Sequence, residues 1–113
     1  MHEMALAQAM VGIAVETAQR QGAARITAVW AEIGALSHAE PDALEFCFPA
    51  ASRGTIAEGA QLNILRTQGA AWCMTCVKSV PLATRYDPCP QCGGHRLQVT
   101  AGEEMRVKEI EVV

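Results

Sequence analysis

Apolar positions near the start of the chain repeat with the period of an α-helix. From residue 3 to residue 21 they recur every three or four positions and form one stripe: Leu6, Ala7, Met10, Val11, Ile13, Ala14 and Ala18. Such a stripe predicts an amphipathic helix with one face on a core. Arg20 suits the last turn of this helix, and Gly22 is typical of the position just beyond a helix end.

Three later stretches have the pattern of longer β-strands, and residues 97–99 are strand-like as well. Residues 25–33 are mostly apolar on both alternating faces, which predicts a central strand covered on both sides. Residues 61–67 form a second candidate strand and residues 104–112 a third. In the third, the apolar side chains change face near Lys108 and Glu109, where a β-bulge would restore the register.

A second helix is predicted to begin at Pro41, because proline is favoured at the first position of a helix. Asp42 adds a negative charge in the first turn, where the helix dipole favours it. Pro49 lies further along the same segment. Proline has no N–H to donate and disfavours helical geometry at the preceding residue, Phe48. The sequence therefore predicts that this helix is interrupted at Pro49.

Four of the five cysteines form two C-x2-C pairs, Cys73 with Cys76 and Cys89 with Cys92, separated by twelve residues. Two such hooks facing each other present four thiolates to a tetrahedral metal ion, with bonds of about 2.3 Å. The spacing predicts a structural zinc site. The remaining cysteine, Cys47, lies between two phenylalanines and is interpreted as a buried apolar thiol.

Paired cysteines also occur in disulfides and in iron sites. Disulfides are disfavoured because the first residues lack a basic region followed by an apolar run, so we expect a reducing cytoplasmic setting. A rubredoxin-type iron site uses similar pairs, and the sequence does not distinguish it from zinc.

The elements together predict an α+β fold. It consists of a small mixed α/β domain, with two helices on a three-stranded sheet, and an inserted zinc-ribbon lobe. Residues 1–69 and 100–113 are assigned to the α/β domain and residues 70–99 to the lobe. The lobe's roughly 30 residues are too few to fold without a metal.

Composition excludes several function classes. The formal net charge is −3 and the sequence pI about 5.5, and the basic residues near the cysteines, Lys78, Arg85 and Arg96, are dispersed. Nucleic-acid binding is therefore not expected, because such domains usually present a basic face. No apolar run approaches the ~20 residues of a membrane span. There is also no nucleophile–base motif, phosphate-binding loop or H-E-x-x-H motif, so we do not expect an enzyme.

The chain opens with Met1, His2 and Glu3. A terminal amine, the His2 amide nitrogen and the His2 imidazole can close fused chelate rings around one cation, with Glu3 or another donor in the fourth position. Planar, nitrogen-rich donor sets suit Ni(II) or Cu(II). Taken alone this signal is weak, because a histidine near a chain end is commonly an ordinary polar residue. His38 and His95 are interpreted as surface residues.

In combination, these features resemble the HypA/HybF family of nickel metallochaperones for [NiFe]-hydrogenase maturation. The resemblance covers the whole chain: the N-terminal tripeptide before a helix, Glu40-Pro41, Phe46-Cys47-Phe48, the two cysteine hooks, and a last strand after Glu103-Glu104-Met105. It implies Ni(II) as cargo on Met1, through its amine, His2 and Glu3. It also implies structural Zn(II) on the four paired cysteines.

The resemblance also implies partners. They are a HypB-type GTPase and the precursor of a hydrogenase large subunit, and some members of the family serve urease as well. The alternative interpretation is a zinc-ribbon interaction module that binds protein or nucleic acid, in which His2 has no role.

Overall fold

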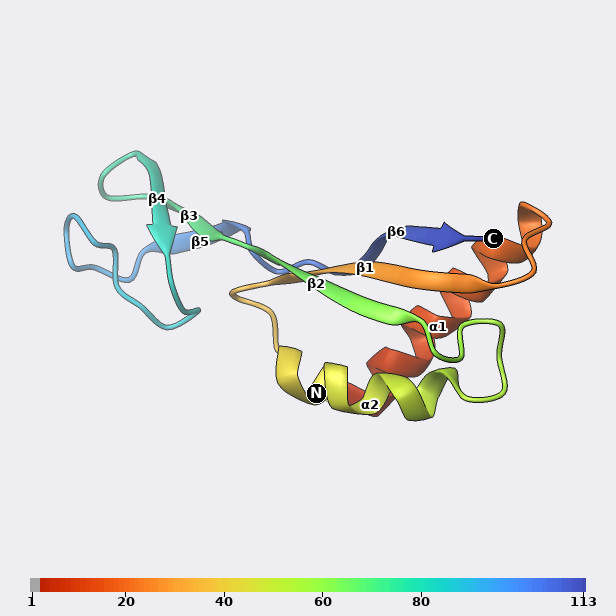
Figure 1. The fold of residues 1–113 in the computed structure, drawn as a ribbon. Helices are drawn as coiled ribbons and strands as arrows, with labels where there is room; N and C mark the ends of the chain where they lie inside the picture. Colours follow the sequence, from red (N-terminus) through yellow and green to blue (C-terminus); the bar gives the residue numbers. More distant parts are fainter. Residues whose placement is uncertain (1–2) are drawn as a thin grey trace. The chain divides into compact units, whose positions relative to one another are not determined.

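The computed structural model describes residues 3–113 and contains two helices and six strands within them (Figure 1). In chain order these are α1 (Glu3–Arg20), β1 (Ile26–Gly34), α2 (Pro41–Ser52), β2 (Gln61–Thr67), β3 (Gly69–Cys73), β4 (Lys78–Leu82), β5 (Leu97–Ala101) and β6 (Met105–Val112). They form two three-stranded sheets, with strand orders β2-β1-β6 and β4-β3-β5. The predicted α+β class, with two helices, a three-stranded sheet and a cysteine lobe, is confirmed.

The chain packs into two compact units. The helical unit comprises the described residues up to Glu32, together with Ala39–Leu65 and Arg106–Val113. The cysteine unit comprises Ile33–His38 and Arg66–Met105. These units are defined by packing; the division into functional domains at residues 1–69 with 100–113 and at residues 70–99 stays a prediction.

The core of the helical unit is built mostly from small and β-branched side chains. It unites buried residues of both helices, of β1 and of the loop after α2: Val11, Ala14, Ala18, Ile26, Val29, Phe48 and Ala57. Alanine on the inner face of α1 lets the helix approach β1 closely, which keeps the interior densely packed. Most of the stripe predicted from the sequence is the buried face of α1, namely Ala7, Met10, Val11, Ala14 and Ala18, whereas Ile13, predicted in the same stripe, is 53% exposed.

The predicted central position of β1 is confirmed, but its predicted cover on both faces is wrong. In Figure 1, α1 and α2 lie on the same side of β1. The other face bears polar pairs between β1 and β6: the Thr27 hydroxyl donates to Glu111 Oε1 at 2.6 Å, and Arg106 forms an ion pair with Glu32. Cross-strand polar pairs of this kind suit a face open to solvent.

In β6 the alternation of exposed and half-buried side chains breaks at Lys108 and Glu109, where two successive residues are exposed. This is the place at which the sequence predicted a change of face. Val107, Ile110 and Val112 nevertheless all pack against the core of the helical unit.

The predicted interruption of the second helix is wrong, because α2 continues through Pro49 to Ser52. The hydrogen bond that Pro49 cannot donate is the one to the carbonyl of Glu45, four residues earlier, and both residues are exposed. A water molecule can therefore donate to the Glu45 carbonyl in place of the missing N–H. One buried row continues across the proline: Leu44, Phe48 and Ser52. Packing of this row outweighs the local cost of the proline.

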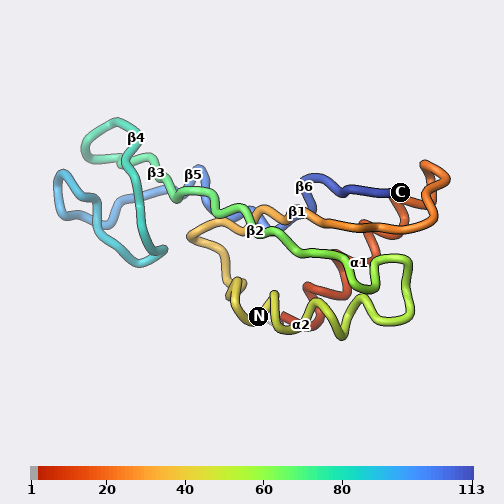
Figure 2. The backbone as a smooth tube through the Cα atoms, in the orientation of Figure 1, coloured from red at the N-terminus to blue at the C-terminus, as the bar shows by residue number. Residues whose placement is uncertain are grey.

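Strands β3 and β4 of the cysteine unit were not found in the sequence. The chain passes from β2 into β3 with one residue, Gln68, between them (Figure 2). β3 pairs antiparallel with β4 and with β5, and its last residue, Cys73, lies opposite Lys78 on one side and Leu97 on the other. The unit has a small core of its own: Leu36, Ala71 and Leu82, with Leu97 and Val99 packed against them.

Three glycines in the cysteine unit allow three chain segments to pass in direct backbone contact. A Cβ on Gly34 would lie 1.9 Å from the carbonyl oxygen of Gly102. A Cβ on Gly102 would lie 2.6 Å from the Cα of Gly69, and Gly102 has φ +100°. Only residues without a side chain fit at this crossing.

Candidate metal centre

The first cysteine hook begins where β3 ends. The backbone N–H of Cys76 donates to the Cys73 sulfur at 3.3 Å, and the N–H of Val77 donates to the Cys73 carbonyl at 2.8 Å. Val77 has φ 55°, a left-handed conformation that is unusual for a β-branched residue. The main chain thus turns back on itself and directs both thiols of this hook to one side.

The second hook lies in an irregular segment and makes the same main-chain turn. The N–H of Gln91 donates to the Cys89 sulfur at 3.4 Å, and the N–H of Gly93 donates to the Cys89 carbonyl at 2.9 Å. Gly93 has φ 73°, so the chain turns sharply just after Cys92. The matching turn at Val77 was missed, because a valine does not signal a left-handed backbone.

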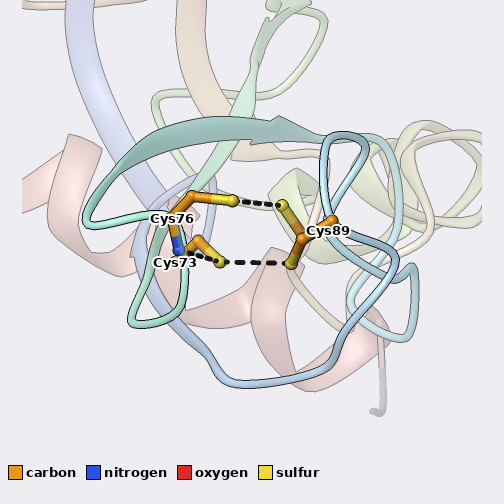
Figure 3. Close-up of side chains that lie close together, drawn as sticks. Cys73, Cys76 and Cys89 are labelled. Atoms are coloured by element: carbon orange, nitrogen blue, oxygen red, sulfur yellow. Dashed lines mark hydrogen bonds between the residues drawn. The ribbon is translucent and has the colours of Figure 1, made fainter.

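The structure brings the four paired cysteines together. Their sulfur atoms all lie within 4.8 Å of one another. The Cys73 and Cys92 sulfurs are 3.7 Å apart, and the Cys76 and Cys89 sulfurs are 3.9 Å apart. Figure 3 shows the Cys76 and Cys89 side chains pointing toward each other, with Cys73 beside Cys76. Each hook therefore contributes one sulfur to each close pair.

These distances fit a tetrahedral metal site and do not fit disulfides. Four sulfurs bonded at about 2.3 Å to one tetrahedral ion lie about 3.8 Å from one another. A disulfide requires a sulfur–sulfur distance of about 2.05 Å. All four cysteines are free thiols. A site with four protein ligands has no open position for a substrate, which is typical of a structural metal.

The electrostatics of the cluster favour a cation at its centre. Burial raises the pKa of the Cys76 thiol to about 12, and its hydrogen bonds with Cys73, Cys92 and Cys89 add to the rise. In contrast, backbone N–H groups of Cys92 and Gln91 lower the pKa of Cys89 to about 6. One sulfur ionises readily, whereas ionisation of all four needs a positive charge between them.

The cluster is closed on one side and open on the other. Cys73 and Cys89 are buried, Cys76 is half-buried and Cys92 is exposed. Val80 is buried against the two inner cysteines, and Leu97 packs on the same group. The metal ligands are therefore themselves part of the core of this unit.

The predicted nickel ligands lie partly outside the described residues, since Met1 and His2 are not among them. Glu3 is the first residue of α1, and its carboxylate accepts from the backbone N–H of Glu40 at 3.4 Å. Glu3 is therefore held beside the start of α2.

The other candidates do not join the sulfur cluster. His38 and His95 are exposed, and Cys47 is a half-buried free thiol on α2 rather than a buried one. Among residues 3–113, the four paired cysteines are the one group of three or more His, Cys, Asp or Glu side chains placed to hold a metal. Over the same range, neither helix is long and apolar enough to cross a membrane.

Comparison with known proteins gives matches over the full length. The family model described as "Hydrogenase/urease nickel incorporation, metallochaperone, hypA" matches residues 1–112. The chain is 59% identical over 112 residues to "Hydrogenase maturation factor HypA" of Rhodopseudomonas palustris strain BisB5, and 57% identical over 112 residues to "Hydrogenase maturation factor HypA 2" of Bradyrhizobium diazoefficiens. Each match covers 99% of both chains.

Solved structures share the fold. The solution structure of the nickel metallochaperone HypA from Helicobacter pylori superimposes with a TM-score of 0.71 at 22% identity, covering 100% of this chain and 98% of the other. A second solution structure, of a HypA protein, gives a TM-score of 0.72 at 24% identity, with 100% and 97% of the two chains covered. From the whole-chain family match and the two close relatives, the chain belongs to the HypA family of nickel-incorporation metallochaperones.

Proposed function

We propose that this protein binds Ni(II) at its N-terminus and delivers the ion during [NiFe]-hydrogenase maturation. The observation that supports this most is the family match, which includes residues 1–3. The ligands would be the Met1 amine, the His2 amide and imidazole nitrogens, and Glu3. A site at a chain end with few donors suits a carrier, because the cargo must leave again.

The position of Glu3 supports this assignment. Its carboxylate lies at the first turn of α1 and contacts the backbone of Glu40, which precedes α2. A nickel ion bound by residues 1–3 would therefore lie close to the start of both helices. A partner that takes the ion would contact this region of the helical unit.

The four-cysteine centre is proposed to hold zinc as a structural ion. The ligand set and the distances fit zinc, and they fit a single iron equally well. Zinc has no redox chemistry and so keeps the site inert during nickel transfer. Elemental analysis of the purified protein tests this: one zinc per chain is expected, and one iron would overturn it.

The proposed partners are a HypB-type GTPase, which participates in nickel delivery, and the precursor of a hydrogenase large subunit. The proposed compartment is the cytoplasm, where thiols stay reduced and available to metal. The alternative function is a zinc-ribbon module that binds protein or nucleic acid. The net charge of −3 counts against its nucleic-acid form.

The nickel site is tested by calorimetric titration of zinc-loaded protein with Ni(II). His2→Ala, and a chain extended by Gly-Ser before Met1, should each bind at least about tenfold more weakly, because each removes one chelating nitrogen. His38→Ala and His95→Ala are matched controls on exposed histidines and should bind normally. If the extended chain binds as tightly as the native chain, the terminal amine is not a ligand.

Delivery requires a second experiment. Nickel-loaded protein is mixed with an immature, nickel-free hydrogenase extract that lacks its own HypA protein, and hydrogenase activity is measured. The native chain should restore activity and His2→Ala should not. Equal restoration by free nickel at the same low concentration would contradict a delivery role.

A further inference from the structure

The cysteine unit has a groove away from its sulfur cluster. One cavity, of about 200 Å³, lies between residues 35–38 and residues 84–86. A second, of about 410 Å³, lies between Ala35, residues 68–69 and residues 81–83. They share Ala35, and their other walls follow each other directly along the chain from Pro81 to Tyr86. The two cavities are therefore neighbours, and together they are called the groove, with the cavity at residues 84–86 as its polar end and the cavity at residues 81–83 as its apolar end.

Two buried donors in the polar end have no partner. Among the described residues, Ser37 Oγ and Arg85 Nε are the two buried side-chain atoms of this kind, and both residues line the same cavity. A buried polar group without a hydrogen bond is costly, so such groups normally have a partner. Two of them in one small cavity indicate a position for an acceptor oxygen.

Both walls of the groove are held by hydrogen bonds that leave these two atoms free. The N–H of Ala35 donates to the Thr67 carbonyl at 2.9 Å, and the N–H of Leu36 donates to the Gly102 carbonyl at 2.8 Å. Arg85 Nη2 donates to the Leu36 carbonyl at 2.9 Å and forms an ion pair with Glu103. The groove is thus preformed, as binding sites usually are.

The opposite wall is fixed in the same way. The Thr84 hydroxyl and backbone N–H donate to the carboxylate of Asp87 at 2.7 and 3.1 Å. These bonds lower the pKa of Asp87, so its carboxylate stays ionised at neutral pH. This wall therefore has a fixed negative charge beside Thr84.

The charges around the polar end favour a neutral ligand. The positive charge of Arg85 is already balanced by Glu103, and Asp87 is a second negative charge near the same cavity. A phosphate or a free carboxylate would be repelled by both carboxylates. A peptide carbonyl accepts hydrogen bonds without adding charge.

The apolar end accepts a side chain. Its wall includes Gly69, Pro81 and Leu82, and it lies beside β4, which is an edge strand of its sheet. Extended peptides commonly bind beside a sheet edge, with one apolar side chain in a pocket. Tyr86, 83% exposed at the polar end, offers a ring that such a peptide would cover.

We propose that this groove binds an extended, uncharged peptide segment of a partner protein. One peptide carbonyl accepts from Ser37 Oγ and Arg85 Nε, and one apolar side chain enters the space beside Ala35 and Leu82. The site goes beyond the proposed nickel function and does not depend on nickel, since none of its residues is a proposed metal ligand.

The test is a heteronuclear NMR titration of the zinc-loaded full chain with acetyl-Leu-Gly-amide. Saturable shifts are expected at residues 35–38, 68–69 and 81–86, with a dissociation constant of about 1 mM, as suits a short peptide. Acetyl-Gly-Gly-amide should bind about tenfold more weakly because it lacks the apolar side chain.

Ser37→Ala provides a variant that separates binding from folding. It should weaken peptide binding about fivefold and leave thermal unfolding unchanged or raised, because the hydroxyl has no partner in the free protein. Ser79→Ala, an exposed serine on β4, is the matched control and should change neither. Ala35 lines both cavities, so the larger side chain of Ala35→Leu would fill the space between them and should abolish peptide binding.

Three results would overturn the proposal. The first is the absence of saturable shifts at the groove up to 20-fold the expected dissociation constant. The second is binding of sodium acetate as tightly as the blocked peptide, which would indicate an anion site. The third is a loss of stability in Ser37→Ala with unchanged peptide binding, which would indicate an internal water site.

Discussion

Val77 and Gly93 occupy the same position in the two cysteine hooks, one residue after the second cysteine of each. Both have positive φ angles, 55° and 73°, and both donate their N–H to the carbonyl of the first cysteine, at 2.8 and 2.9 Å. Glycine adopts this conformation freely, whereas a β-branched residue is strained in it. The two halves of the sulfur cluster are thus alike in geometry but unequal in backbone strain.

Val77→Gly should stabilise the metal-loaded protein by about 1 kcal/mol, because it relieves a strained conformation. Little burial is lost, since Val77 is 66% exposed. Denaturant unfolding of the zinc-loaded protein measures the change. Gly93→Val is the reciprocal control and should destabilise. Lower stability of Val77→Gly would mean that the side chain contributes more than its strain costs.

Loss of the metal should disorder the cysteine unit and leave the helical unit folded. The core around Val80 consists of Cys73 and Cys89 themselves, whereas the core of the helical unit contains no cysteine ligand. Cys76→Ser, or treatment with a chelator, should therefore collapse amide dispersion for residues 66–105 in NMR spectra. Signals of α1 and α2 should persist. Simultaneous loss of the NMR signals of residues 66–105 and of the two helices would show that the two units fold as one.

Metal binding at the cluster should become more sensitive to pH below about pH 6. Cys76, with its pKa raised to about 12, must release a proton to the metal throughout the neutral range. Cys89, with its pKa lowered to about 6, has already lost its proton at pH 7 and regains it as pH falls. Affinity therefore falls with decreasing pH, and more steeply once Cys89 is protonated.

Calorimetry in two buffers of different ionisation enthalpy counts the protons that zinc displaces. More protons should be released per zinc at pH 5.5 than at pH 7.5, by up to one. Release of equal numbers of protons per zinc at the two pH values would show that the Cys89 thiol does not titrate between them.

Gly34→Ala should be severely destabilising, by roughly 3 kcal/mol or more. The new methyl would lie 1.9 Å from the Gly102 carbonyl oxygen and 2.8 Å from the Glu103 nitrogen, and both are backbone atoms that cannot rotate away. Gly12→Ala is the contrasting control: apart from its chain neighbours and the backbone of its own helix, nothing lies within 4 Å of its new methyl, so the substitution should stabilise α1 by about 0.5–1 kcal/mol. Thermal unfolding measures both changes in stability, and a Gly34→Ala protein as stable as the native chain would contradict the prediction.

The metal centre was largely predictable because its signal is local. A C-x2-C pair fixes two sulfurs on one turn, and two pairs imply one cluster, which the structure forms. Helix α1 was predictable for the same reason, since its stripe has a clear period. Neither inference requires knowledge of how distant segments pair.

Features that depend on distant segments could not be predicted. β3, from Gly69 to Cys73, is rich in alanine and has no alternating pattern; it is a strand because it pairs with neighbours on both sides. The groove at Ser37 and Arg85 joins residues 48 positions apart, and no local pattern marks it. The left-handed turn at Val77 is imposed by the hook and opposes the preference of its residue.

The continuity of α2 through Pro49 leads to a last prediction. The helix keeps Pro49 because Phe48 and Ser52 are buried on either side of it, at 2% and 1% exposure. The proline still removes one backbone hydrogen bond and crowds the preceding turn. Pro49→Ala restores the N–H opposite the Glu45 carbonyl and, at an exposed position, disturbs no packing.

A proline costs about 3 kcal/mol inside a helix, but Pro49 begins the last turn and also restricts the unfolded chain. The expected gain from Pro49→Ala is therefore smaller, about 1 kcal/mol, and denaturant unfolding measures it. Ala50→Gly, at the next exposed position, is the control and should lose about 1 kcal/mol if residues 49–52 are helical in solution. If Pro49→Ala is destabilising and Ala50→Gly is neutral, the last turn is not helical, and the helix is interrupted at Pro49 as the sequence alone predicted.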